Sequence, residues 1–238
     1  MSRVGRASLM VFVGALIGRL VIDGGFGWFV QQRMRWPLAI AAFILLVFGA
    51  YELIRSTRHG QESAHGAGPR VGWLVALPLL VLVSVAPTAL GAVAAERVDA
   101  YVPTESTSRF SELPDTGDAV PMRVIEFLDR AAWDEERSLE GRVIQLEGLV
   151  VNDPAVPDGF KLTRFMVSCC AADGIPLQVT VHGTGATLSD DTWVIADLIW
   201  RPPTVPYQET EGEWIIEADA VLISPVVGVP KDPYESPY

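Results

Sequence analysis

Residues 37–54 read PLAIAAFILLVFGAYELI, and their only charged side chain, Glu52, lies close to the end of the run. In a helix, 18 residues rise about 27 Å, which approaches the ~30 Å thickness of the hydrocarbon layer of a bilayer. A segment this long and this apolar predicts a membrane-spanning helix rather than a strand.

Another apolar segment, residues 71–93, reads VGWLVALPLLVLVSVAPTALGAV and contains no charged residue. Its 23 residues are enough to cross a bilayer. Pro78 and Pro87 lie inside the segment, as bilayer helices tolerate when neighbouring groups satisfy the freed carbonyls. We expect another membrane span here.

The first apolar segment, residues 7–30, carries Arg19 and Asp23, whose i, i+4 spacing places them on one helical face. A cleaved signal peptide fits less well, because Arg19 breaks the hydrophobic region and no small-residue cleavage site follows. An unpaired charge in a bilayer is costly, so we expect the two side chains to pair. The pair either holds helices together or belongs to a transport path or subunit contact.

The charges divide the chain into two halves. Residues 1–95 hold 8 Lys and Arg against 3 Asp and Glu, whereas residues 96–238 hold 10 against 26. The acidic half lacks the clustered cations that nucleic-acid binding requires, so we expect no nucleic-acid partner. Five arginines lie before residue 7 and in the loop after residue 54, whereas two lie in the loop between the segments 7–30 and 37–54. The positive-inside rule therefore predicts a multi-pass plasma-membrane protein with a cytoplasmic N-terminus and an extracytoplasmic C-terminal domain.

The pattern beyond residue 95 is that of a soluble domain. Residues 96–121 are rich in Ser, Thr, Pro and acidic residues and predict a linker. Residues 122–136 have the apolar spacing of an amphipathic helix, and alternating apolar segments follow. Strands are expected at 142–151, 160–170, 175–181, 191–200 and 213–223.

One helix and five short strands within residues 122–225 predict an OB-like β-barrel, because closure removes exposed strand edges. An open β-sandwich is the alternative. Residues 226–238 are expected to form a tail. The predicted fold class is therefore a membrane α region with three transmembrane helices, followed by a soluble five-stranded OB-like β-barrel domain with one helix.

The two cysteines of the chain, Cys169 and Cys170, are adjacent. Neighbouring side chains on a strand point to opposite faces, so both can reach one ion only where the strand ends or bends. The Ala-Ala-Asp-Gly sequence that follows allows a bend. Thiolates suit zinc or a similar ion, with Asp173 or His182 as further metal ligands. Simple burial of both thiols and thiol redox chemistry remain alternative interpretations.

The run FMVSCCAADGIPLQVTV at 165–181, followed by DTW at 191–193, resembles the YcgQ-like family of bacterial permease subunits. The resemblance covers nearly the whole chain, including the loop that carries His59 and His65. It implies an accessory membrane subunit of a two-component permease. The partner implied by the resemblance is a multi-span permease-like membrane protein.

Two functional hypotheses follow. In the first, an exported β domain binds a ligand or a metal while the spans dock on a permease in the lipid bilayer. In the second, the chain is a membrane-anchored envelope module that binds a metal or a protein and has no transport role. We do not expect an enzyme, because the sequence contains no nucleophile elbow, phosphate-binding loop or HExxH motif.

Overall fold

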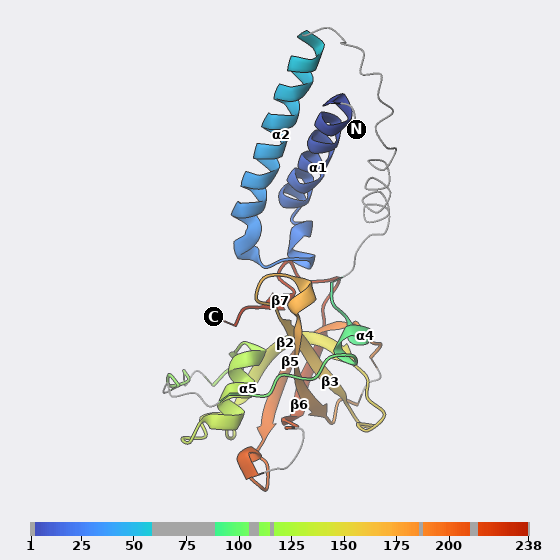
Figure 1. The fold of residues 1–238 in the computed structure, drawn as a ribbon. Helices are drawn as coiled ribbons and strands as arrows, with labels where there is room; N and C mark the ends of the chain where they lie inside the picture. The colour runs from blue at the N-terminus through green and yellow to red at the C-terminus, as the bar shows by residue number, and fades with distance from the viewer. Residues whose placement is uncertain are drawn as a thin grey trace. The chain divides into compact units, whose positions relative to one another are not determined.

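The computed structural model describes residues 3–58, 89–104, 110–114, 117–185, 188–209 and 214–237. The chain divides into two compact units, Met1–Thr88 and Ala89–Tyr238 (Figure 1). Residues 71–88 of the predicted span 71–93 lie outside the described residues. The loop with His59 and His65 lies outside them as well.

The first unit contains two antiparallel helices, α1 (Arg3–Asp23) and α2 (Arg35–Arg58), joined through the 3-10 turns η1 (Gly25–Trp28) and η2 (Gln32–Met34). Both helices are long and apolar enough to cross a membrane. Two candidate spans, rather than the three predicted, are thus found in the described part of the chain. Large apolar side chains are exposed on both helices, among them Phe12, Ile22, Trp36, Phe43, Phe48 and Tyr51.

The first helix is shorter than the predicted segment 7–30. It ends at Asp23 because Gly24 adopts a left-handed backbone conformation with φ 77°, after which η1 begins. The Nε atom of Arg19 lies 3.1 Å from Oδ2 of Asp23. The two side chains therefore pair, but in the last turn of α1 rather than within a longer span.

The two helices of the first unit pack closely through small residues. A Cβ atom at Gly14 would lie 3.0 Å from the carbonyl oxygen of Ala42, and one at Gly49 would lie 2.7 Å from Cγ2 of Val11. Ala7 and Ala42 are buried. The small residues repeat every seven positions on both helices, so they form one seam along which the backbones approach.

The second unit is built on a closed five-stranded β-barrel. Its strands are β2 (Val143–Val151), β3 (Phe160–Met166), β4 (Ile175–His182), β5 (Trp193–Arg201) and β6 (Glu217–Pro225). They are hydrogen-bonded in the order β2-β5-β6-β4-β3, and β3 pairs back with β2. Neighbouring barrel strands are antiparallel except β4 and β6, which run parallel. The predicted barrel is confirmed, and the open sandwich is not formed.

Closure of the barrel depends on β2, which pairs with both β5 and β3. The first part of this strand, Val143–Leu149, pairs with β5, and its last part, Leu149–Val151, pairs with β3. A Cβ atom at Gly148 would lie 2.7 Å from Cδ2 of Leu162 and 2.8 Å from the carbonyl oxygen of Thr163. Glycine at this position therefore allows β2 and β3 to approach closely beside the residues that pair them.

The hydrophobic core lies inside the barrel and beneath the helix α5 (Val124–Trp133). Side chains alternate between the interior and the surface along most of β2 and β5, as the period-2 pattern predicted. One face of α5 contributes buried residues to the same core, so the predicted amphipathic helix is confirmed. These residues are Val124, Ile125, Phe127, Leu128 and Ala131.

Segments predicted as linker and tail also belong to the barrel unit. The two-residue strand β1 (Val120–Pro121) pairs with β2, and β7 (Tyr234–Glu235) pairs with β3, both in parallel. The backbone N–H of Tyr101 donates to the carbonyl oxygen of Pro176 at 2.9 Å. Parts of 96–121 and 226–238 are therefore ordered against the barrel.

Residues 89–95, predicted as the end of the membrane region, pack on the barrel instead. The short helix α4 (Ala92–Ala95) buries Ala92 and Ala95 in a second apolar cluster with residues of β2, β3 and β5. Asp191 Oδ1 accepts the backbone N–H of Ala92 at 2.6 Å, and Tyr234 Oη accepts that of Leu90 at 3.1 Å. The boundary between the units therefore lies before Ala89.

Candidate metal centre

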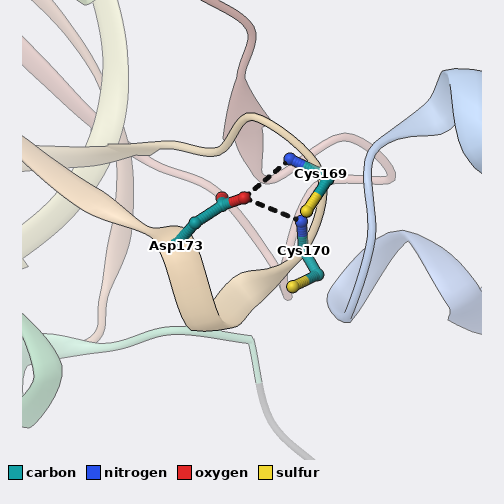
Figure 2. A group of neighbouring side chains, drawn as sticks. All are labelled: Cys169, Cys170 and Asp173. Atoms are coloured by element: carbon teal, nitrogen blue, oxygen red, sulfur yellow. Dashed lines mark hydrogen bonds between the residues drawn. The ribbon is translucent and has the colours of Figure 1, made fainter.

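The two cysteines lie in the turn that joins β3 to β4 (Figure 2). The pairing of these strands ends with Met166 opposite Ile175, and the intervening turn contains the 3-10 helix η3 (Ala171–Asp173). Both cysteines are free thiols, with Cys169 exposed and Cys170 half-buried. Because β3 has ended before Cys169, the strand geometry that would separate the two side chains does not apply.

Asp173 organises the backbone of this turn. Its Oδ1 atom accepts the backbone N–H of Ser168 at 2.9 Å. Its Oδ2 atom accepts the N–H groups of Cys169 and Cys170 at 2.9 Å and 3.4 Å, the two bonds drawn in Figure 2. One carboxylate thus binds three consecutive amides and fixes the backbone that carries both thiols.

The sequence contained a signal for this role of Asp173. Cys170 occupies the N-cap position of η3 and Asp173 the third helical position, which is the spacing of a capping box. From the sequence alone, Asp173 is expected only to be a metal ligand. Its hydrogen bonds show that it also positions the cysteines.

The geometry of the turn suits a small metal site. The Sγ atoms of Cys169 and Cys170 and a carboxylate oxygen of Asp173 all lie within 4.8 Å of one another. Bonds of ~2.3 Å to sulfur and ~2.0–2.2 Å to oxygen place the ligands of a tetrahedral zinc ion roughly 3.5–3.8 Å apart. Small side-chain rotations would therefore bring the three groups onto one ion and leave a fourth position open.

The Asp173 carboxylate also affects the protonation of the Cys169 thiol. Hydrogen bonding of the Cys169 thiol to Asp173, and then to Cys170, raises the pKa of Cys169 to about 11. Partial burial would raise the pKa of Asp173, but hydrogen bonds from the Cys169 thiol and the backbone amides outweigh it and lower that pKa. At neutral pH a protonated thiol therefore faces an ionised carboxylate, and a bound cation must displace the thiol proton.

The structure does not bring His182 to the cysteines. This residue ends β4, whose eight residues span roughly 23 Å from the cysteine turn at the other end. Its Nδ1 atom lies 3.3 Å from Oδ1 of Asp158, and its Nε2 atom lies 2.8 Å from Oε1 of Glu217. Of the two predicted additional ligands, only Asp173 lies beside the thiols.

The cysteine turn falls within a region of similarity to a known family. Residues 130–199 match the family model of the DUF1980 C-terminal domain. The matched segment runs from within α5 to within β5, so it includes β2, β3, β4 and the turn with both cysteines. No curated protein and no solved structure matches the chain.

Proposed function

We propose that this chain is an accessory membrane subunit of a two-component permease, and that its exported barrel binds a thiophilic metal ion through Cys169 and Cys170. The observation that carries the proposal is the turn in which two thiols and the Asp173 carboxylate lie within 4.8 Å of one another. A donor set with two sulfur atoms favours zinc among the common divalent ions. The two apolar helices of the first unit supply the membrane anchor.

The setting of the turn favours an exchangeable ion over a structural one. The barrel has a hydrophobic core of its own, and Cys169 is exposed outside that core. Structural zinc sites are usually closed by four protein ligands, whereas Cys169, Cys170 and Asp173 provide three. An open position lets the site receive an ion and pass it to a partner, a role that requires no catalysis by this chain.

We also propose that the barrel is of the OB type and that the chain belongs to the YcgQ-like family. The OB type is supported by five barrel strands in the closed order β2-β3-β4-β6-β5, although α5 precedes the first of them. The family is supported by the sequence at 165–181. The match to the DUF1980 C-terminal domain contains this whole segment.

The proposed topology has a third span between residue 71 and Thr88 and an extracytoplasmic barrel, as the arginine distribution favours. A reporter that is active only outside the cytoplasm, fused after Tyr238, should give a signal. The matched fusion of a reporter that is active only in the cytoplasm should give none. The opposite pair of results would invert the topology.

Metal content tests the proposed site. The full-length chain, purified in detergent with a reducing agent and supplied with zinc, should retain about one ion per chain. The Cys169→Ser/Cys170→Ser double variant should retain none. His182→Gln serves as the matched control and should bind zinc like the wild type, because His182 is held by Asp158 and Glu217. Wild-type protein without stoichiometric metal would overturn the proposed site.

The partner tests the transport role. Affinity purification of the full-length chain from its native membranes should recover a multi-span permease-like protein in a stoichiometric amount. The cysteine double variant should recover the same partner if docking depends on the membrane helices. Recovery of a zinc-binding chain without any such partner would favour the envelope-module hypothesis over the transport hypothesis.

A further inference from the structure

A pocket of about 340 Å³ lies between the two helices of the first unit, where α1 begins and α2 approaches its end. Figure 1 shows these two helix termini at the same end of the antiparallel pair. Among the described residues, the pocket is lined by Arg6, Ala7 and Met10 of α1 and by Glu52 and Arg55 of α2. Its volume falls in the range of small-molecule sites, about 300–1,000 Å³.

The packing of the helices directs Glu52 toward this pocket. A Cβ atom at Gly49 would lie 3.1 Å from the carbonyl oxygen of Ala7, so this face of α2 lies against α1. Glu52 follows Gly49 by three residues and therefore lies on the same face, one turn nearer the end of α2. Its side chain is half-buried there. On the facing helix, Arg6 directly precedes the buried Ala7 and borders the same space.

Arg6 and Glu52 carry opposite charges in one pocket, yet they form no ion pair with each other. Neither side chain has a hydrogen-bond or ion-pair partner among the residues that the structure describes. A carboxylate on an apolar helix is costly without a counter-charge. Arg55 adds a second cation to the lining. The pocket therefore presents cationic groups and one unpaired anionic group to a ligand that lies between the helices.

A ligand that carries both signs of charge matches this lining. Guanidinium groups donate to phosphate oxygens, and a primary ammonium group donates to a carboxylate. The headgroup of an ethanolamine phospholipid combines a phosphate and a primary ammonium two carbons apart. Helices long enough to cross a bilayer place their ends at the depth of such headgroups. Val4, Met10 and Tyr51, exposed close to these charges in the sequence, supply apolar surface for acyl chains.

We propose that this pocket binds the headgroup of an ethanolamine phospholipid, with the phosphate at Arg6 and Arg55 and the ammonium at Glu52. The bound lipid bridges α1 and α2 at the charged end of their seam. Free O-phosphoethanolamine has the same headgroup chemistry without acyl chains. The site rests on the membrane location of the first unit and shares no residue with the cysteine turn, so it is independent of the proposed metal site.

Native mass spectrometry of the full-length chain, delipidated in detergent, measures the binding of four probes. They are dioleoylphosphatidylethanolamine, dioleoylphosphatidylglycerol, dioleoylphosphatidylcholine and O-phosphoethanolamine. The glycerol lipid has no ammonium group, and the ammonium group of the choline lipid has no N–H donor. We expect the ethanolamine lipid to bind about 10-fold or more tightly than either of these lipids, because only its ammonium group forms a charge-assisted hydrogen bond with Glu52.

Two variants assign the two halves of the headgroup. Glu52→Gln should weaken binding of the ethanolamine lipid about 10-fold and leave binding of the glycerol lipid undiminished, because only the ammonium contact is lost. Arg6→Gln should weaken binding of both lipids, because both carry the phosphate. Arg35→Gln, at an exposed residue at the start of α2 and outside the pocket, is the control and should bind like the wild type. An unaltered thermal unfolding midpoint of Glu52→Gln shows that any loss of binding is local.

The outcomes also separate the two sources of the headgroup. Weaker binding of O-phosphoethanolamine than of the ethanolamine lipid supports a membrane lipid as the ligand, whereas equally tight binding identifies a free phosphorylated amine and overturns the lipid assignment. The headgroup site is overturned if the three lipids bind equally, or if Glu52→Gln leaves binding of the ethanolamine lipid unchanged. Either result leaves the zinc content of the chain as a separate test of the metal site.

Discussion

The carboxylate of Glu235 accepts the backbone N–H of Val124 at 2.8 Å, across 111 residues of chain. Its other oxygen accepts the N–H of Ile125 at 3.0 Å. These amides belong to the first turn of α5, where backbone donors have no partner within the helix. The last strand, β7, therefore pairs with β3 and also caps the helix that covers the barrel core.

Removal of this cap should destabilise the barrel unit. We expect Glu235→Ala to lower the free energy of unfolding by about 1–3 kcal/mol, because two buried amides lose their acceptor. Urea unfolding followed by tryptophan fluorescence measures the change. Glu136→Ala, at an exposed residue next to α5, is the control and should stay within about 0.5 kcal/mol of the wild type. Equal effects of the two substitutions would contradict the capping role.

The seam between α1 and α2 predicts a contrast between two glycines. A Cβ atom at Gly49 would lie 2.7 Å from Cγ2 of Val11, whereas one at Gly18 would meet nothing within 4 Å. Gly49→Leu should therefore force the helices apart, and Gly18→Leu should not. The readout is the rate of maleimide labelling of Ala42→Cys, placed at a buried position of the seam in a chain without the native cysteines. Similar rates in both variants would show that the seam does not hold the helices together.

Asp173 should control the reactivity of Cys169. Asp173→Asn removes the anionic acceptor that contributes most to the raised pKa of about 11, so the pKa of Cys169 should fall toward its ordinary value of 9.0. At pH 8 the thiolate fraction, and with it the rate of alkylation by iodoacetamide, should rise about 10-fold or more. Mass spectrometry at several pH values resolves Cys169 from Cys170. Asp118→Asn, at an exposed residue outside the cysteine turn, is the control and should react like the wild type. An unchanged pH profile of Asp173→Asn would refute this electrostatic account.

The pair Arg19 and Asp23 should show coupling. With their Nε and Oδ2 atoms 3.1 Å apart, Asp23→Ala leaves an uncompensated cation near the end of an apolar helix. The single variant should therefore reduce the amount of chain in the membrane more than the Arg19→Ala/Asp23→Ala double variant does. Quantification of full-length protein in isolated membranes measures both. Equal reductions would mean that the two charges act independently.

The main helices and strands of this protein follow from local patterns in its sequence. The apolar run at 37–54 is long enough for a helix that could cross a bilayer, and α2 extends over it. The alternation in β2 and β5 and the helical spacing of α5 arise because each residue's side chain must reach either the core or the solvent. The turn signal after the cysteines predicted a strand that ends at residue 170, whereas β3 ends at Met166, before both cysteines.

The partners of these elements were decided by tertiary structure. The strands β1 and β7 contain two residues each, too few to show any period, and exist only because neighbouring barrel strands offer free hydrogen-bonding groups. The extent of the first helix depended on the backbone conformation of Gly24, which the hydropathy of 7–30 does not encode.

The candidate metal centre shows the same division. Adjacent positions made Cys169 and Cys170 a candidate pair, and the N-cap spacing of Asp173 kept it within reach. His182 is separated from them by a strand, and its distance follows from the length of β4 and from the carboxylates that hold its ring. Short sequence separations determine which side chains can meet around a turn, whereas contacts between distant segments arise only when the barrel closes.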